Sequence, residues 1–266
     1  MAPLPPPPPR PPRLPPPPPR PAPASSGPRV VTNTYDHSVS RWGLGEVVLT
    51  LVLYIVVGTG IGLLALGGDV DSTLEGPWLP GVLTVPPMAA LAYLTWLARR
   101  RGAGLTADFR LQARRQDLLV GFGLLVGAWI MAIATLLIMI ALGGEAPSAA
   151  AADLAIDSGE GTGITVWILA FAVLGSTLVP LVEELLFRGL FWSALEKRGI
   201  NNIVTLLITS AGFAAFHFEP SRFPILFAIG LAFGVGRLVT GRIAASILAH
   251  ALVNAVSMVA IISEVA

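Results

Sequence analysis

Residues 177–192 read TLVPLVEELLFRGLFW, and this long apolar run contains Glu183, Glu184 and Arg188. The chain of 266 residues is 54% hydrophobic and only 12% charged, whereas soluble domains carry about 25% charged residues. Composition therefore predicts an integral membrane protein. An ionised side chain at the centre of a bilayer costs about 2.5–3.5 kcal/mol, so each of the three needs a partner or a function.

Apolar stretches of about 17–25 residues, the length that a bilayer core requires, recur along the chain. They lie near residues 45–66, 77–98, 117–142, 163–186, 201–217, 222–239 and 242–263. Apolar residues in them do not alternate with polar ones, which favours helices over the strands of a barrel. We therefore predict an all-α, polytopic transmembrane helix bundle of about seven spans over residues 42–266.

Residues 1–41 are rich in proline and arginine and begin MAPLPPPPPRPPRLPPPPPRPAP. Proline has a fixed φ and no N–H, so this segment is expected to be a disordered, solvated tail in the polyproline II conformation. It contains no apolar core of a signal peptide. A semi-rigid spacer is the favoured interpretation, and a proline-recognising partner of unknown identity is the alternative.

Charge predicts the orientation of the chain. Basic residues occur in the tail, in 99–115, at Lys197 and Arg198, and at Arg237 and Arg242, whereas the loops 67–76 and 143–161 contain no Lys or Arg. The positive-inside rule then places the N-terminus in the cytoplasm and the C-terminus outside, with only Arg222 on the outer side. Arg237 and Arg242 are expected to be anchors at the inner membrane surface.

Composition also indicates the source and excludes some chemistry. Every basic residue except Lys197 is an arginine, and Gly and Pro are abundant, which suggests GC-rich coding and a bacterial cytoplasmic membrane. The absence of cysteine excludes disulfides, a thiol nucleophile and a thiolate metal site. A net charge of +1 gives no sign of a nucleic-acid partner.

The two adjacent glutamates are expected to have different roles. Glu184 and Arg188 are four residues apart with the acid first, the favourable orientation for an ion pair on a helix. Glu183 is rotated about 100° from Glu184 on the helix and so points elsewhere. Glu183 is therefore a buried carboxylate without an evident partner.

Two further segments carry polar side chains within apolar spans. FAAFH presents Phe213 and His217 on one helix face, and HALVN presents His250 and Asn254 on another. A single His or Asn in a span commonly forms a hydrogen bond between helices. Several such polar side chains near an unpaired carboxylate instead favour a shared functional pocket. Counting residues from the charged loops places Glu183 and His217 at the same depth and His250 nearer the surface.

Elimination leaves one proteolytic chemistry. The chain has no GxSxG elbow, no HExxH motif and no pair of aspartates within its spans. A glutamate general base with His and Asn donors remains, because a carboxylate can take a proton from water and such donors can stabilise an oxyanion. The small-xxx-small pattern of Gly230 and Gly234 predicts close helix packing instead of a site.

The three motifs EELLFRG, FAAFH and HALVN resemble, in order, the EExxxR, FxxxH and HxxxN signatures of the CAAX prenyl endopeptidase and bacteriocin-processing (CPBP, or Abi) family of intramembrane proteases. The resemblance covers roughly residues 165–262, and it implies a catalytic CAAX-protease-like core at 163–264. The first three spans and the tail resemble nothing that we can name.

The resemblance also implies roles for individual residues. Glu183 would activate the water and His217 would be its partner on that water. His250 and Asn254 would form the oxyanion site, and Glu184 and Arg188 would brace the pocket, supported by Phe213.

A metal is the alternative to this glutamate chemistry. Glu183, His217 and His250 could form a His₂Glu zinc site with an open position. We favour a metal-free reaction, since the three residues lie on separate helices and no carboxylate is evident to orient either histidine.

The sequence therefore predicts an intramembrane endopeptidase, glutamate-type or metalloprotease, whose partners are the lipid bilayer and a membrane-associated protein or peptide substrate. The alternatives are a proton- or ion-coupled transporter, since intramembrane Glu, His and Arg also form proton relays, and a non-catalytic membrane immunity or scaffold protein.

Overall fold

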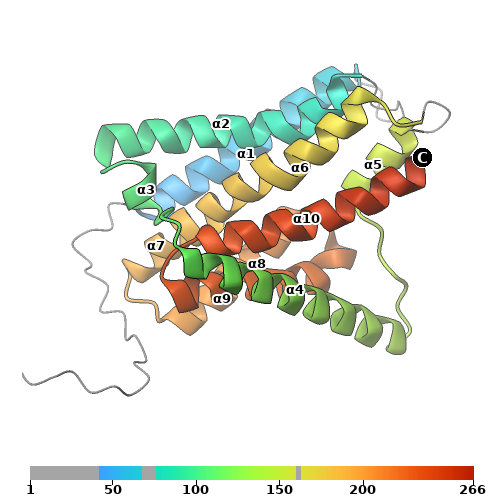
Figure 1. Cartoon of the computed structure of the whole chain (residues 1–266). Coiled ribbons are helices and arrows are strands. Elements are labelled where there is room, and N and C mark those ends of the chain that lie inside the picture. The colour runs from blue at the N-terminus through green and yellow to red at the C-terminus, as the bar shows by residue number, and fades with distance from the viewer. Residues whose placement is uncertain (1–41, 68–75, 160–162) are drawn as a thin grey trace, which may run out of the picture. The chain divides into compact units, whose positions relative to one another are not determined.

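The computed structural model describes residues 42–67, 76–159 and 163–266. The predicted Pro-rich tail, residues 1–41, lies outside these residues and stays a prediction. In the described part of the chain every regular element is a helix and no residue is in a strand (Figure 1). The all-α prediction is confirmed.

Long helices and short connecting helices alternate along the chain. They are α1 (Leu44–Ala65), α2 (Trp78–Arg101), α3 (Leu105–Asp108), α4 (Arg115–Ala141), α5 (Ala150–Gly159), α6 (Val166–Glu184), η1 (Leu185–Phe191), α7 (Trp192–Glu196), α8 (Asn202–Phe216), η2 (Pro220–Arg222), α9 (Phe223–Thr240) and α10 (Ala244–Val265).

Six helices in the described residues are long and apolar enough to cross a membrane: α1, α2, α4, the continuous α6–η1–α7 unit, α9 with its preceding turn η2, and α10. A helix stands at each of the seven predicted positions, but α8 has only 15 residues. At 1.5 Å per residue α8 rises about 22 Å, which is less than the roughly 30 Å of a bilayer core.

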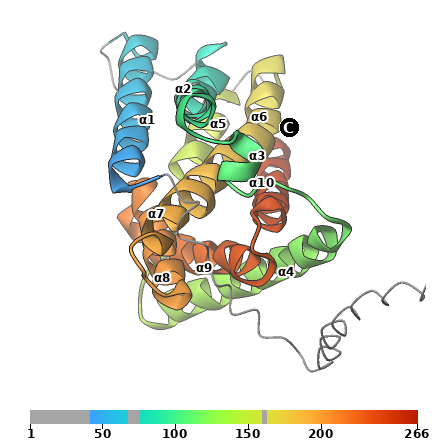
Figure 2. The same ribbon diagram turned by 90° about the vertical axis from the view of Figure 1, so that its left-hand side faces the viewer.

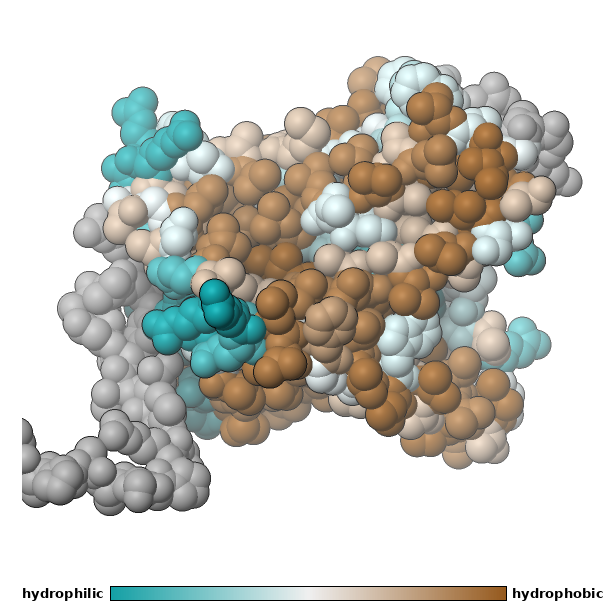
Figure 3. All heavy atoms as spheres, viewed as in Figure 1, coloured by the Kyte–Doolittle hydropathy of each residue, from teal (hydrophilic) through white to brown (hydrophobic). Residues whose placement is uncertain are grey.

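Large apolar side chains point outward from these helices, as lipid-facing residues do. Leu119 is 80% exposed and Leu64 70% exposed, although both lie within spans. Figure 3 shows that apolar residues cover most of the visible surface. In a soluble protein such large apolar side chains are mostly buried, so their exposure here supports the assignment of these helices to a membrane.

The helices pack in a sequential set of contacts. α1 packs on α2, α2 on α6 and α6 on α10, and α10 in turn contacts α4 and α9, with α8 packed on α9. Figure 2 views this arrangement from the side at which α7, α8 and α9 lie below α1, α2 and α6. Other helices thereby enclose residues 177–192, which lie in α6, in η1 and at the start of α7.

Glycines allow α9 to approach its neighbours closely, as its small-xxx-small pattern predicted. A Cβ at Gly234 would lie 2.3 Å from the side chain of Leu206, and one at Gly230 would lie 3.3 Å from the backbone of Ser210, both on α8. A side chain at either position would therefore force Leu206 or the α8 backbone to shift, so the two glycines favour the close α8–α9 packing.

The basic segments gather at one end of the bundle. The Ile243 N–H donates to the Arg110 carbonyl over 3.1 Å, which joins the α3–α4 connection to the α9–α10 turn. The end of α2 and the start of α4 lie at the same end in Figure 1, and hydrophilic residues collect there in Figure 3. Segments that the charge rule placed on one side of the membrane thus lie together.

Arg237 and Arg242 are not surface anchors, contrary to the prediction. They are 2% and 9% exposed, and they pair with Glu196 and Asp117 respectively. The expectation that His250 lies nearer the surface than Glu183 is also wrong, because His250 contacts both glutamates of α6.

Candidate active site

Glu184 and Arg188 form the predicted ion pair in the centre of the protein. Both side chains are 0% exposed, and Arg188 Nη1 donates to Glu184 Oε1 over 2.8 Å. Arg188 Nη2 also donates to the Gly230 carbonyl on α9 over 2.6 Å. The arginine therefore ties α6–η1 to α9 and neutralises one of the two buried carboxylates.

A π-helix follows the two glutamates directly. Leu185–Phe191 has i→i+5 hydrogen bonding, whereas Glu183 and Glu184 end the regular α6. π-helical turns are rare and are frequently found at functional sites, because the wider turn changes the direction of the side chains. No feature of the sequence predicted this element.

His250 lies between the two glutamates. Its Nδ1 donates to Glu184 Oε1 over 3.0 Å, since an ionised carboxylate can only accept. Its Nε2 lies 3.7 Å from Glu183 Oε2. Phe233 stacks on the imidazole with centroids 4.5 Å apart, and Phe213 packs its edge at 5.5 Å. Glu184 and these two rings fix the imidazole so that Nε2 faces Glu183.

His217 is oriented in a similar way from α8. Its Nδ1 donates to the Phe213 carbonyl over 2.8 Å, because a carbonyl has no proton to give. Nε2 is thereby left as an acceptor when the ring is neutral. The predicted proximity of Phe213 and His217 on one helix face is confirmed, with their rings 4.8 Å apart.

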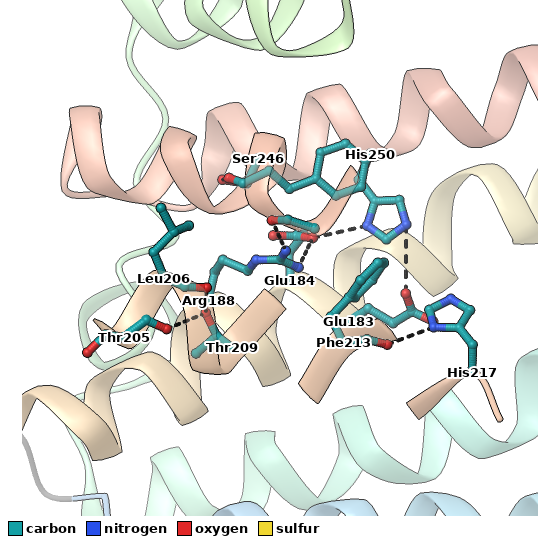
Figure 4. Close-up of polar contacts among 12 residues, drawn as sticks. Glu183, Glu184, Arg188, Thr205, Leu206, Thr209, Phe213, His217, Ser246 and His250 are labelled. Carbon is teal, nitrogen blue, oxygen red and sulfur yellow. Dashed lines mark hydrogen bonds and ion pairs between the residues drawn. The ribbon is translucent and has the colours of Figure 1, made fainter. Parts of the chain in front are cut away.

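Glu183 is buried but has an oxygen without a hydrogen-bond partner. Its side chain is 7% exposed, and Oε2 is among the few buried polar atoms of the described residues that lack a partner. Figure 4 shows the Glu183 carboxylate between the rings of His217 and His250. The different directions predicted for Glu183 and Glu184 are confirmed.

Asn254 reaches the same region from α10, one helical turn after His250. Its Nδ2 donates to the Gly175 carbonyl on α6 over 2.9 Å. An amide nitrogen carries two hydrogens, so one remains for a ligand. The contact also joins α10 to α6 beside the pocket.

All four predicted catalytic residues line one cavity of about 410 Å³. The rest of its lining is mainly apolar and comes from α1, α2, α4, α5, α6, α9 and α10. Tyr54 of α1 and Trp129 of α4 belong to this lining and were missed by the sequence analysis. An aromatic residue in an apolar span gives no signal of its own, because lipid-facing and core positions favour the same residue types.

The described donors do not form a ready metal site. No group of three or more His, Asp or Glu side chains in the described residues is arranged to hold a metal ion. One premise of the metal-free prediction is nevertheless wrong, because Glu184 does orient His250, and the Phe213 carbonyl orients His217. Such partners are typical of metal-binding histidines as well as of catalytic ones.

Comparison with known proteins agrees with this site. Residues 165–256 match the model of a protein family described as type II CAAX prenyl endopeptidase Rce1-like. No curated protein and no solved structure matched the chain. The matched segment contains Glu183, Glu184, Arg188, Phe213, His217, His250 and Asn254. Over this segment, about a third of its length, the chain is therefore similar to the Rce1-like family of type II CAAX prenyl endopeptidases.

Proposed function

We propose that the chain is an intramembrane endopeptidase in which Glu183 activates a water molecule to hydrolyse a peptide bond of a membrane-associated substrate. One observation carries the proposal: the buried Glu183 Oε2 has no hydrogen-bond partner and lies near two fixed imidazole rings. A buried polar oxygen without a partner costs about 1–3 kcal/mol, so its retention favours a bound water or substrate there.

The proposed reaction uses the positions of these groups. Glu183 takes one proton from water, His217 Nε2 accepts a hydrogen bond from the other O–H, which stays on the oxygen, and that oxygen attacks the carbonyl carbon of the substrate. The C–O bond forms as the carbonyl electron pair moves to oxygen. Collapse of the tetrahedral intermediate breaks the C–N bond, and Glu183 returns its proton to the leaving nitrogen.

His250 and Asn254 would stabilise the oxyanion. Asn254 has one N–H beyond the bond to Gly175, and His250 offers a second N–H when its ring is doubly protonated. Both side chains line the largely apolar cavity, where an N–H donor stabilises a developing negative charge more strongly than it does in water.

The large cavity would accept the substrate. Its apolar lining suits an apolar chain segment or an attached lipid, and the family that matches residues 165–256 acts on prenylated CAAX proteins by its name. We infer a bacterial cytoplasmic membrane with the N-terminus inside, which the arginine-rich composition and the clustering of basic segments at one end support.

Replacing Glu183 tests the proposed function. Glu183→Gln keeps the size of the side chain but cannot accept a proton, and loss of a general base typically lowers the rate by about 10²–10⁴. The purified variant should express and melt like the wild type and should not cleave quenched fluorescent CAAX peptides, prenylated or not. Normal cleavage by Glu183→Gln would reject the mechanism. A wild-type chain that binds but never cleaves such peptides would favour the non-catalytic alternative.

Chelation separates the glutamate mechanism from zinc chemistry. We expect proteolysis to continue after exhaustive treatment with a chelator, and we expect no stoichiometric zinc in the purified protein by elemental analysis. Activity that disappears with chelation and returns specifically with zinc would instead assign Glu183, His217 and His250 as ligands.

A further inference from the structure

A second cavity also reaches Glu183 and His217. It has a volume of about 300 Å³ and lies between α1 and the end of α8. Its lining consists of Tyr54, Ile55, Gly58, Thr59, Glu183, Phe216, His217 and Phe218. We call it the α1–α8 cavity.

The α1–α8 cavity and the large cavity share three lining residues: Tyr54, Glu183 and His217. Two of these are the residues proposed to activate the water. The two cavities therefore meet at the reacting groups, with Tyr54 as the third side chain at the junction.

The backbone beside the α1–α8 cavity leaves the helical conformation. α8 ends at Phe216 after 15 residues, and Phe218 then has a φ of 56°, outside any helix. A helix of 15 residues rises about 22 Å, less than the roughly 30 Å of a bilayer core. Non-helical backbone within a bilayer core occurs only where it is buried in protein or lines a water-filled cavity. Phe218 lines the α1–α8 cavity and is 69% exposed, which favours a water-filled cavity.

A separate route for water follows from the reaction itself. An apolar substrate that fills the large cavity displaces water from that side of Glu183. Apart from Tyr54, Glu183 and His217, the two cavities have no lining residue in common. Water can thus reach the carboxylate while the substrate is bound.

Tyr54 is held at the junction by its ring and offers its hydroxyl. The ring packs edge-on against Phe216 with centroids 4.8 Å apart. The Tyr54 side chain lines both cavities together with Glu183. Tyr54 lies on α1, outside the segment 165–256 that matches the family.

We propose that the hydrolytic water enters through the α1–α8 cavity and that the Tyr54 hydroxyl donates a hydrogen bond to it. The water then gives one hydrogen to Glu183 and one to His217 Nε2, and it accepts one from Tyr54. One lone pair remains for the attack on the substrate carbonyl. This inference rests on the proposed function for its kinetic part, but the presence of water in the cavity can be tested without any activity.

The chain contains no cysteine, so a single introduced thiol reports on water directly. Thr59→Cys places the thiol in the α1–α8 cavity, and Val56→Cys places it on the same helix at similar depth but outside both cavities. A charged methanethiosulfonate reagent, which reacts with hydrated thiolates, should label position 59 and not position 56. If the reagent does not label position 59, or if it labels both positions equally, the proposed water route is wrong.

Kinetics on the same proteins test the role of the route and of Tyr54. Labelling of Thr59→Cys should lower kcat at least tenfold with little change in KM, while reagent treatment of Val56→Cys should change neither. Tyr54→Phe keeps the ring against Phe216, so it should melt like the wild type. Its kcat should fall about tenfold with KM unchanged, the effect of one lost hydrogen bond to the transition state.

The outcomes distinguish the two proposals. If the wild type cleaves peptides and Glu183→Gln does not, but Tyr54→Phe keeps the wild-type kcat, the role of Tyr54 is wrong and the proposed function stands. If Glu183→Gln cleaves normally, the mechanism is wrong, and the labelling of position 59 alone decides whether the cavity holds water.

Discussion

At the scale of single residues, the carboxylate of Glu184 serves two side chains at once. It accepts one hydrogen bond from Arg188 and one from His250. The neighbouring Glu183 accepts a hydrogen bond from neither residue, and its Oε2 lies 3.7 Å from His250 Nε2. Two adjacent residues of one type thus make different contacts, because successive side chains on a helix point about 100° apart. Glu184 both stabilises the protein and orients a site residue.

Glu184→Gln should therefore lower stability and activity together. It leaves Arg188 as an uncompensated buried charge, and breaking a buried pair in this way typically costs about 3–5 kcal/mol. The variant should be scarce and should melt at a lower temperature than Glu183→Gln. Thermal unfolding in detergent would measure the difference, and equal melting temperatures for the two variants would contradict the assignment.

Adding Arg188→Met to Glu184→Gln separates the two roles of Glu184. Removing the orphaned charge should restore much of the melting temperature. The peptide-cleavage rate should stay low, because His250 still lacks the carboxylate that orients its imidazole. Recovery of both properties would mean that Glu184 acts only through the ion pair.

At the scale of elements, glycines on α9 decide how closely the helices around the site approach. A Cβ at Gly236 would lie 2.6 Å from Ser246 Oγ, 2.7 Å from Leu124 Cδ1 and 3.2 Å from the Ser246 backbone nitrogen. This position therefore joins α9 to both α4 and α10. Since α10 carries His250 and Asn254, the contact also positions the two proposed oxyanion donors.

Gly236→Ala should destabilise the protein by about 1–3 kcal/mol, the usual cost of overpacking. Its matched control is Gly60→Ala, which is also within a helix but has nothing within 4 Å of the added Cβ. Thermal unfolding should show a loss for position 236 and none for position 60. A normal melting temperature for Gly236→Ala would show that α10 can move away without cost.

At the scale of the whole molecule, the orientation in the membrane stays a prediction. The basic segments lie together at one end, which agrees with the charge rule but does not show which side of the membrane that end faces. Single cysteines can show it. Ala103→Cys should react with an impermeant thiol reagent only from the cytoplasmic side, and Ser148→Cys only from outside. The reverse pattern would invert the topology.

The sequence by itself determined the class of the fold and the candidates for the site. A low fraction of charged residues and apolar stretches of spanning length predict transmembrane helices, because the bilayer leaves few alternatives for backbone hydrogen bonding. The same scarcity makes each buried Glu, Arg, His and Asn conspicuous. Contacts within one helix, such as Glu184 with Arg188, follow from spacing alone.

Contacts between helices were decided only by the tertiary structure. The bond from His250 to Glu184, the burial of Arg237 and Arg242, and the placement of Tyr54 beside Glu183 join residues far apart in the chain. Apolar faces that pack on protein and those that contact lipid use the same residue types, so periodicity does not identify the partner of each helix. The π-helix after Glu184 likewise depends on how the surrounding helices enclose η1.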